Sequence, residues 1–64
     1  MANERQKEIG RWIQDRYPKG GAAQQEFKMV LNIYLQHGDP KAEAVTKALS
    51  SVRERHPRFV PIER

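Results

Sequence analysis

The 64-residue sequence contains no cysteine. A disulfide framework and thiolate zinc sites are therefore excluded, and we expect a reducing, cytoplasmic setting for the protein. A chain of this length also has little room for a hydrophobic core. We expect efficient helix packing or oligomerisation to supply the stability that disulfides would otherwise add.

Long hydrophobic runs are absent as well. No apolar segment approaches the roughly 20 residues that cross a bilayer, and the residues after Met1 are too polar for the core of a signal peptide. We therefore expect no membrane association. We expect a complete cytoplasmic product with a single domain, residues 1–64.

Residue groups that carry chemistry are scarce. The two histidines, His37 and His56, are too few for a zinc site of three or four ligands. Each falls at the end of an expected helix, where a cation is favourable. The sequence has no nucleophile motif, and Gly20-Gly21 lacks the rest of a phosphate-binding fingerprint. We predict a protein that is not an enzyme and that carries no cofactor or metal.

Helical periodicity predicts three helices, with capping residues and prolines at their ends. Asn3 and Gln6 form a capping-box pattern at the first start, Gly38 suits the end of the second helix, and Asp39-Pro40 suits the start of the third. No stretch alternates with period two over the length of a strand. We predict an all-α, three-helix domain with helices over about 4–17, 22–37 and 40–55.

The second predicted helix is apolar around most of its circumference, which is typical of a helix covered on more than one side. One stripe contains Ala23, Phe27, Val30 and Tyr34, and a second stripe beside it contains Leu31 and Leu35. The other two helices offer only narrow seams, from Ala2 through Ile9 and Ile13 to Tyr17, and through Val45, Ala48, Leu49 and Val52. These seams suffice for the first stripe alone. We therefore predict that Met29, Leu31 and Leu35 form an interface with a second copy or a partner protein.

The last residues, 57–64, are predicted to form an extended tail because Pro57 and Pro61 exclude a regular helix. Phe59 and Ile62 give this tail too much apolar surface for a solvated end. We predict that they are anchors. The tail either packs on the core or serves as a recognition segment.

Basic side chains exceed acidic ones by four, and the excess lies at the two ends of the chain. Such a balance favours an anionic partner. The predicted basic patch consists of Arg53, Arg55, Arg58 and Arg64. Guanidinium groups pair with phosphates and carboxylates alike, so nucleic acid and an acidic protein surface both stay open.

We predict a small protein-interaction module, a homodimeric regulator or inhibitor of a larger protein, of a kind common in bacterial and phage genomes. The alternative is a DNA-binding transcriptional regulator, in which the second and third helices form a helix-turn-helix-like unit and the C-terminal arginines contact DNA. Two features weaken this alternative. Val45 and Leu49 lie one residue too far beyond Gly38, and Glu43 and Glu54 on the outward face would repel phosphates.

Overall fold

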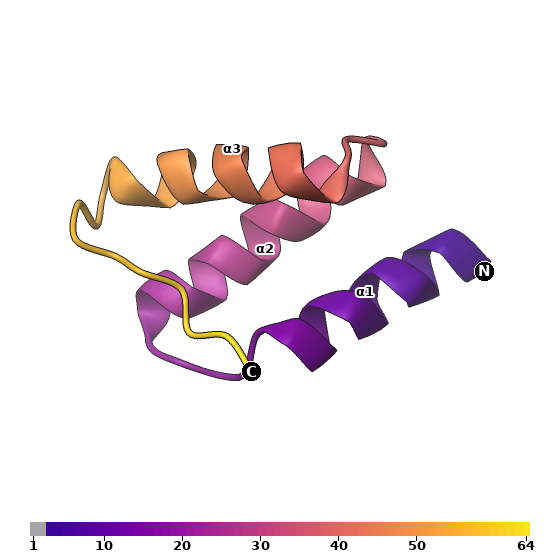
Figure 1. Cartoon of the computed structure of the whole chain (residues 1–64), viewed down its shortest axis with the longest axis horizontal. Helices are drawn as coiled ribbons and strands as arrows, with labels where there is room; N and C mark the ends of the chain where they lie inside the picture. The colour runs from indigo at the N-terminus through magenta and orange to yellow at the C-terminus, as the bar shows by residue number, and fades with distance from the viewer. Residues whose placement is uncertain (1–2) are drawn as a thin grey trace.

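The computed structural model describes residues 3–64 as three helices joined by short connections (Figure 1). The helices are α1 (Glu4–Arg16), α2 (Ala22–Gln36) and α3 (Lys41–Arg53). None of the described residues forms a strand. The predicted all-helical, three-helix domain is confirmed, and the predicted Ala2 end of the first seam lies outside the described residues.

Local chemistry sets most of the helix ends. The Asn3 Oδ1 atom accepts a hydrogen bond from the Gln6 amide at 2.8 Å, which is the N-cap that the sequence predicts. Tyr17 leaves α1 with an extended backbone, as a residue before proline prefers. Beyond α2, Gly38 has a φ of 98°, in the left-handed region that glycine tolerates best.

The start of α3 differs from the prediction. Pro40 occupies the N-cap position, and no side chain caps the helix. The Asp39 carboxylate instead accepts a hydrogen bond from Lys47 Nζ at 3.0 Å. Asp39 therefore pairs with a side chain inside α3 and not with the free backbone amides at the start of the helix.

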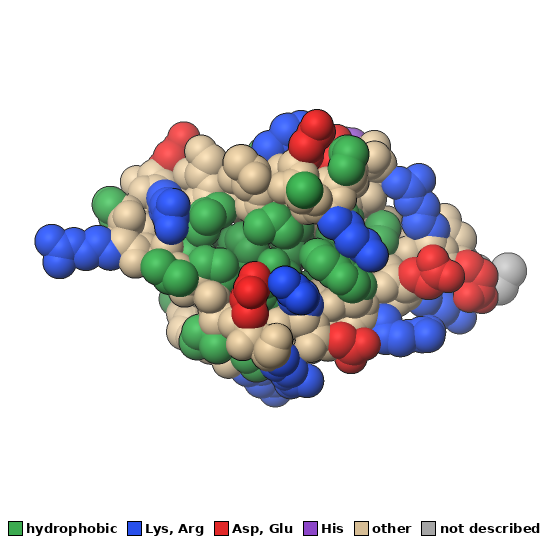
Figure 2. All heavy atoms as spheres, viewed as in Figure 1, with side chains coloured by type: hydrophobic (Ala, Val, Ile, Leu, Met, Phe, Trp, Pro, Cys, Tyr) green, Lys and Arg blue, Asp and Glu red, His purple; other side chains and the backbone are tan. Residues whose placement is uncertain are grey.

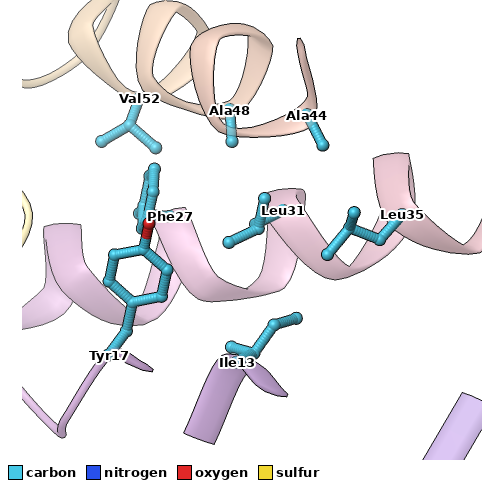
Figure 3. Close-up of a cluster of buried hydrophobic side chains, with 8 residues drawn as sticks. All are labelled: Ile13, Tyr17, Phe27, Leu31, Leu35, Ala44, Ala48 and Val52. Carbon is cyan, nitrogen blue, oxygen red and sulfur yellow. The ribbon is translucent and has the colours of Figure 1, made fainter. Parts of the chain in front are cut away.

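The central element is α2, which packs against both α1 and α3, whereas the backbones of α1 and α3 lie further apart in the described chain. The α2 and α3 helices run antiparallel and side by side (Figure 1). Figure 3 shows the facing pairs along their seam: Phe27 with Val52, Leu31 with Ala48, and Leu35 with Ala44. Within the described residues, no helix is both long enough and apolar enough to cross a bilayer.

The core is formed by the side chains that are fully or almost fully buried: Ile13, Tyr17, Phe27, Leu31, Leu35, Ala44, Ala48 and Val52 (Figure 3). The Tyr17 and Phe27 rings meet nearly at right angles with their centroids 5.1 Å apart, an arrangement favoured by the quadrupoles of the two rings. All three helices therefore contribute to one continuous core.

After α3 the chain turns back across the molecule. Residues 59–64 adopt neither helix nor strand and end beside the C-terminal end of α1, as the yellow segment in Figure 1 shows. There the Arg64 amide donates a hydrogen bond to the Arg16 carbonyl at 2.9 Å. The first and last parts of the chain are thereby tied together.

Candidate interaction surfaces

Leu31 and Leu35 lie in the core of a single chain, so the prediction that they form an interface is wrong. Leu31 has no exposed surface, and Leu35 is 5% exposed. The prediction placed α1 and α3 over the neighbouring stripe, but the two helices flank the leucines from opposite sides. Small alanines on α3 allow this close approach. As a result Val30, which the periodicity assigned to the core, is only partly buried.

Met29 is the one member of the predicted interface that is exposed. Its side chain is 63% exposed, and Ile33, one turn further along α2, is 49% exposed. Because each residue of an α-helix is rotated by about 100° from the last, both lie nearly opposite Leu31. We call this face the outer ridge and define it by Gln25, Met29, Ile33 and Gln36.

A hollow of about 340 Å³ lies beside the outer ridge, between α1 and α2. Gly10 and Gln14 of α1 and Lys28 and Met29 of α2 are among the residues that line it. Lys28 is 8% exposed, and its Nζ atom donates a hydrogen bond to Gln14 Oε1 at 2.9 Å. This bond ties α1 to α2 and satisfies a charge that would otherwise be costly to bury.

A second concave surface, which we call the Trp12 groove, runs between α1 and α3. Two adjoining hollows of about 330 and 260 Å³ both include Trp12 and Lys41. The Lys41 ammonium lies 4.9 Å from the centre of the indole ring, at cation–π distance. In Figure 2 hydrophobic side chains fill the valley between the two helices, with charged side chains along its edges. Its apolar lining includes Ile9, Trp12, Leu35, Pro40 and Val45.

The sequence prediction did not identify this groove. Trp12 lies on the flank of the α1 seam, where a large side chain is more often part of the core. One feature of the sequence does point to the groove. Trp12 lies beside the row of α1 residues that includes Ile13 and Tyr17, and in the structure its indole is partly buried at the edge of the core. Whether α1 and α3 close over such a side chain depends on the helix arrangement, which local periodicity does not determine.

The structure divides the predicted basic patch. Arg53 and Arg55 lie at the C-terminal end of α3 and have internal partners: Arg53 Nε donates to the Phe59 carbonyl at 3.1 Å, and Arg55 forms an ion pair with Glu26 at 2.9 Å. Arg58 follows in an exposed turn, whereas Arg64 lies across the molecule beside the end of α1. The four arginines therefore do not form one continuous surface.

The tail packs on the core through two different kinds of anchor. The Phe59 ring lies against Phe27, with the ring centroids 5.7 Å apart. Ile62 is held by its backbone, because its amide and carbonyl both bond to the buried Gln24 side chain, while its own side chain is 53% exposed. Both predicted anchors contribute to docking, and Gln24 is a partner that the sequence prediction missed.

The pKa values of Tyr17 and Lys47 are raised by their surroundings. Burial raises the pKa of Tyr17, and the nearby Glu63 carboxylate raises it further. The hydrogen bond and charge of Asp39 raise the pKa of Lys47. His56 Nε2 lies 3.5 Å from Glu26 Oε2, and in residues 3–64 no three His, Asp or Glu side chains are grouped as metal ligands.

No family model, curated protein or solved structure that was compared with this chain matches it.

Proposed function

We propose that the chain is a small non-enzymatic protein-interaction module, a homodimeric regulator or inhibitor that binds a larger protein through the Trp12 groove. One observation carries this proposal. The only tryptophan of the chain lines an apolar valley between two helices, where it stays partly exposed. Tryptophan is enriched at the energetic centres of protein interfaces, and such centres are concave and apolar with polar edges.

The shape of the groove favours an amphipathic helix as its occupant. A valley between two helices accepts the apolar side of a third helix, which inserts side chains at one-turn spacing. The edges carry Arg5, Glu8 and Lys41, and the whole chain has a net charge of +4. An acidic partner would therefore associate faster than a basic one, because the net charge steers the approach.

The DNA-binding alternative has less support. A helix-turn-helix sets its two helices at a steep angle so that the second helix can enter the major groove. Here α2 and α3 face each other from Phe27 to Leu35 as an antiparallel hairpin (Figure 3). Arg55 is already paired with Glu26, so it offers less charge to phosphates.

The proposal is tested by recovering partners from a nuclease-treated lysate of the source cell with immobilised wild-type protein and two charge-matched variants. Lys41→Glu alters the groove, and Lys7→Glu makes the same change on an exposed part of α1 outside the hollows. We expect Lys7→Glu to recover the same protein as the wild type. Lys41→Glu should reduce its recovery at least tenfold, about the effect of 1.4 kcal/mol.

A third variant, Trp12→Ala, removes the central side chain, and circular dichroism checks that it still folds. Equal recovery by wild type, Lys41→Glu and a folded Trp12→Ala would contradict the groove as the binding site. Recovery that is seen only from a lysate without nuclease treatment, or that falls steeply with added salt, would favour the DNA-binding alternative instead.

A further inference from the structure

We infer that two copies of this chain associate back to back through the outer ridge of α2, related by a two-fold axis. This interface rests on the proposed homodimer and assigns it a surface. Leu35 lines the Trp12 groove on the inner side of α2, whereas Met29 and Ile33 point the opposite way. Such a dimer leaves both grooves free and directed outward, so that a dimeric partner could occupy the two sites at once.

The four residues that define the outer ridge are uncharged, although 31% of the residues of the chain are charged. The α2 helix, which is described over its whole length, contains only two charged residues, Glu26 and Lys28. Glu26 lies seven residues before Ile33, at the edge of the ridge, where its charge is paired with Arg55, and Lys28 is turned toward Gln14 of α1. Two copies with a charge of +4 each repel one another. The repulsion between the two copies should oppose association least at the outer ridge, because this surface has no unpaired charge.

The order of residues along the ridge suits self-association. Read from either end of α2, the ridge has the same order of residue types, glutamine, apolar, apolar and glutamine, at nearly the same spacing. These residues are Gln25, Met29, Ile33 and Gln36. In an antiparallel pair of α2 helices, Met29 of one copy faces Ile33 of the other, and the glutamines face each other at both ends. A two-fold interface requires this kind of complementarity, because the same surface is used twice.

The hollow beside Met29 supplies the matching depression. Gly10 lies at its α1 wall, and a side-chain carbon placed there would meet no atom within 4 Å. A helix with glycine in its interior is less stable than one with alanine at the same position, so we look for a role of Gly10 that offsets this cost. An open wall at Gly10 lets an apolar side chain of the second copy enter the hollow.

The expected interface is small. A stable interface at the low end of the usual range covers about 600 Å² on each copy, roughly one eighth of the 4652 Å² surface of the chain. The α2 helix has 15 residues and is only about 22 Å long. The α1 wall of the hollow must therefore contribute, and we expect association that depends on concentration.

Sedimentation velocity of the full chain from roughly 5 to 500 μM tests the inference, a range chosen for a weak interface. We expect the wild-type mass to rise from 7.5 kDa toward twice that value. Ile33→Glu should stay monomeric throughout. Val60→Glu places the same charge on an exposed apolar tail residue, which is 70% exposed, and should associate like the wild type. Gly10→Gln, which fills the hollow without adding charge, should weaken association at least tenfold.

The facing positions are tested with two double variants. A chain with both Met29→Lys and Ile33→Glu should regain association, since opposite charges then face each other across the two-fold axis. A chain with Met29→Glu and Ile33→Glu should not. Circular dichroism and thermal melting confirm that each variant folds, which is expected because both positions are exposed.

A dimeric wild type whose association is unaffected by Ile33→Glu and Gly10→Gln would overturn the outer ridge as the interface and leave the homodimer standing. A wild type that stays monomeric at every concentration would overturn both. Neither result affects capture of a partner by the Trp12 groove, because that measurement compares Lys41→Glu with Lys7→Glu.

Discussion

The Gln24 side chain and the Ile62 backbone exchange two hydrogen bonds. Gln24 Nε2 donates to the Ile62 carbonyl at 3.0 Å, and the Ile62 amide donates to Gln24 Oε1 at 3.1 Å. Gln24 Nε2 also donates to the Pro18 carbonyl at 3.1 Å. The amide of one side chain thus pairs with the tail as a neighbouring strand would, and it joins the α1–α2 connection to the C-terminus.

We predict that Gln24→Leu destabilises the protein by about 2 kcal/mol, because two carbonyls and one amide lose a buried partner. Urea unfolding gives the free energy. The neighbouring change Gln25→Leu, at an exposed position, should alter stability by no more than about 0.5 kcal/mol. In a chain that ends at Phe59 the cost of Gln24→Leu should shrink, since the Ile62 partner is gone. An equal cost in both chains would contradict a direct coupling between Gln24 and the tail.

Two adjacent glycines should respond differently to the same substitution. A side-chain carbon at Gly20 would lie 2.7 Å from Gln24 Cβ, whereas one at Gly21 would meet nothing within 4 Å. We predict that Gly20→Ser costs about 1–3 kcal/mol, because Gln24 is held in place and cannot move aside. Gly21→Ser should be neutral or slightly stabilising, since serine can cap an α2 helix that has no side-chain cap. Thermal melting of the two variants tests this, and equal melting temperatures would count against a tightly held Gln24.

The positions of the helices follow from residues whose effects are local. Asn3, Pro18 and Gly38 each act within one turn of the backbone, so the sequence predicts where the helices begin and end. The face of α2 that becomes the core depends on what packs against it. The α2 helix is apolar on several sides, and the alanines of α3 determine that Leu31 is covered while Val30 lies at the edge.

Contacts between distant parts of the chain were the least predictable. Gln24 and Ile62 are separated by 38 positions, and nothing near Gln24 in the sequence distinguishes it from the exposed Gln25. A glutamine is buried only when distant groups satisfy its amide. The Trp12 groove has the same origin, because it exists only through the separation of α1 and α3.

A further prediction concerns the connection between α2 and α3. Gly38 has a φ of 98°, which a residue with a side chain adopts at a cost of about 1–2 kcal/mol. An added carbon would also lie 3.2 Å from Arg5 Nη2. We predict that Gly38→Ala destabilises the protein by at least about 1 kcal/mol. Gly10→Ala, within α1, should stabilise the monomer by about 0.5–1 kcal/mol. Urea unfolding at low protein concentration compares the two, and a similar loss in both would refute the backbone explanation.

The raised pKa of Tyr17 predicts a loss of stability in alkaline solution. Burial is the main cause, with the Glu63 carboxylate adding to it, and the folded protein therefore holds the phenolic proton more tightly than the unfolded chain. The stability that this group contributes is fully present below its ordinary pKa of 10.0 and is lost as the pH rises through the raised value. Lys47 acts in the same direction, because its charged form is favoured by Asp39 in the folded state.

We therefore predict that the free energy of unfolding falls as the pH rises above about 10, through the raised pKa values of Tyr17 and Lys47. Tyr17→Phe keeps the ring packing against Phe27 and removes the ionisable group, so its free energy should fall less steeply over this range. Lys47→Met removes the second contribution, and a chain with both changes should show the flattest dependence. Urea unfolding at several pH values gives these slopes. If the free energy of unfolding of Tyr17→Phe falls with pH in parallel with that of the wild type, burial of the phenol is not the cause of the loss of stability in alkaline solution.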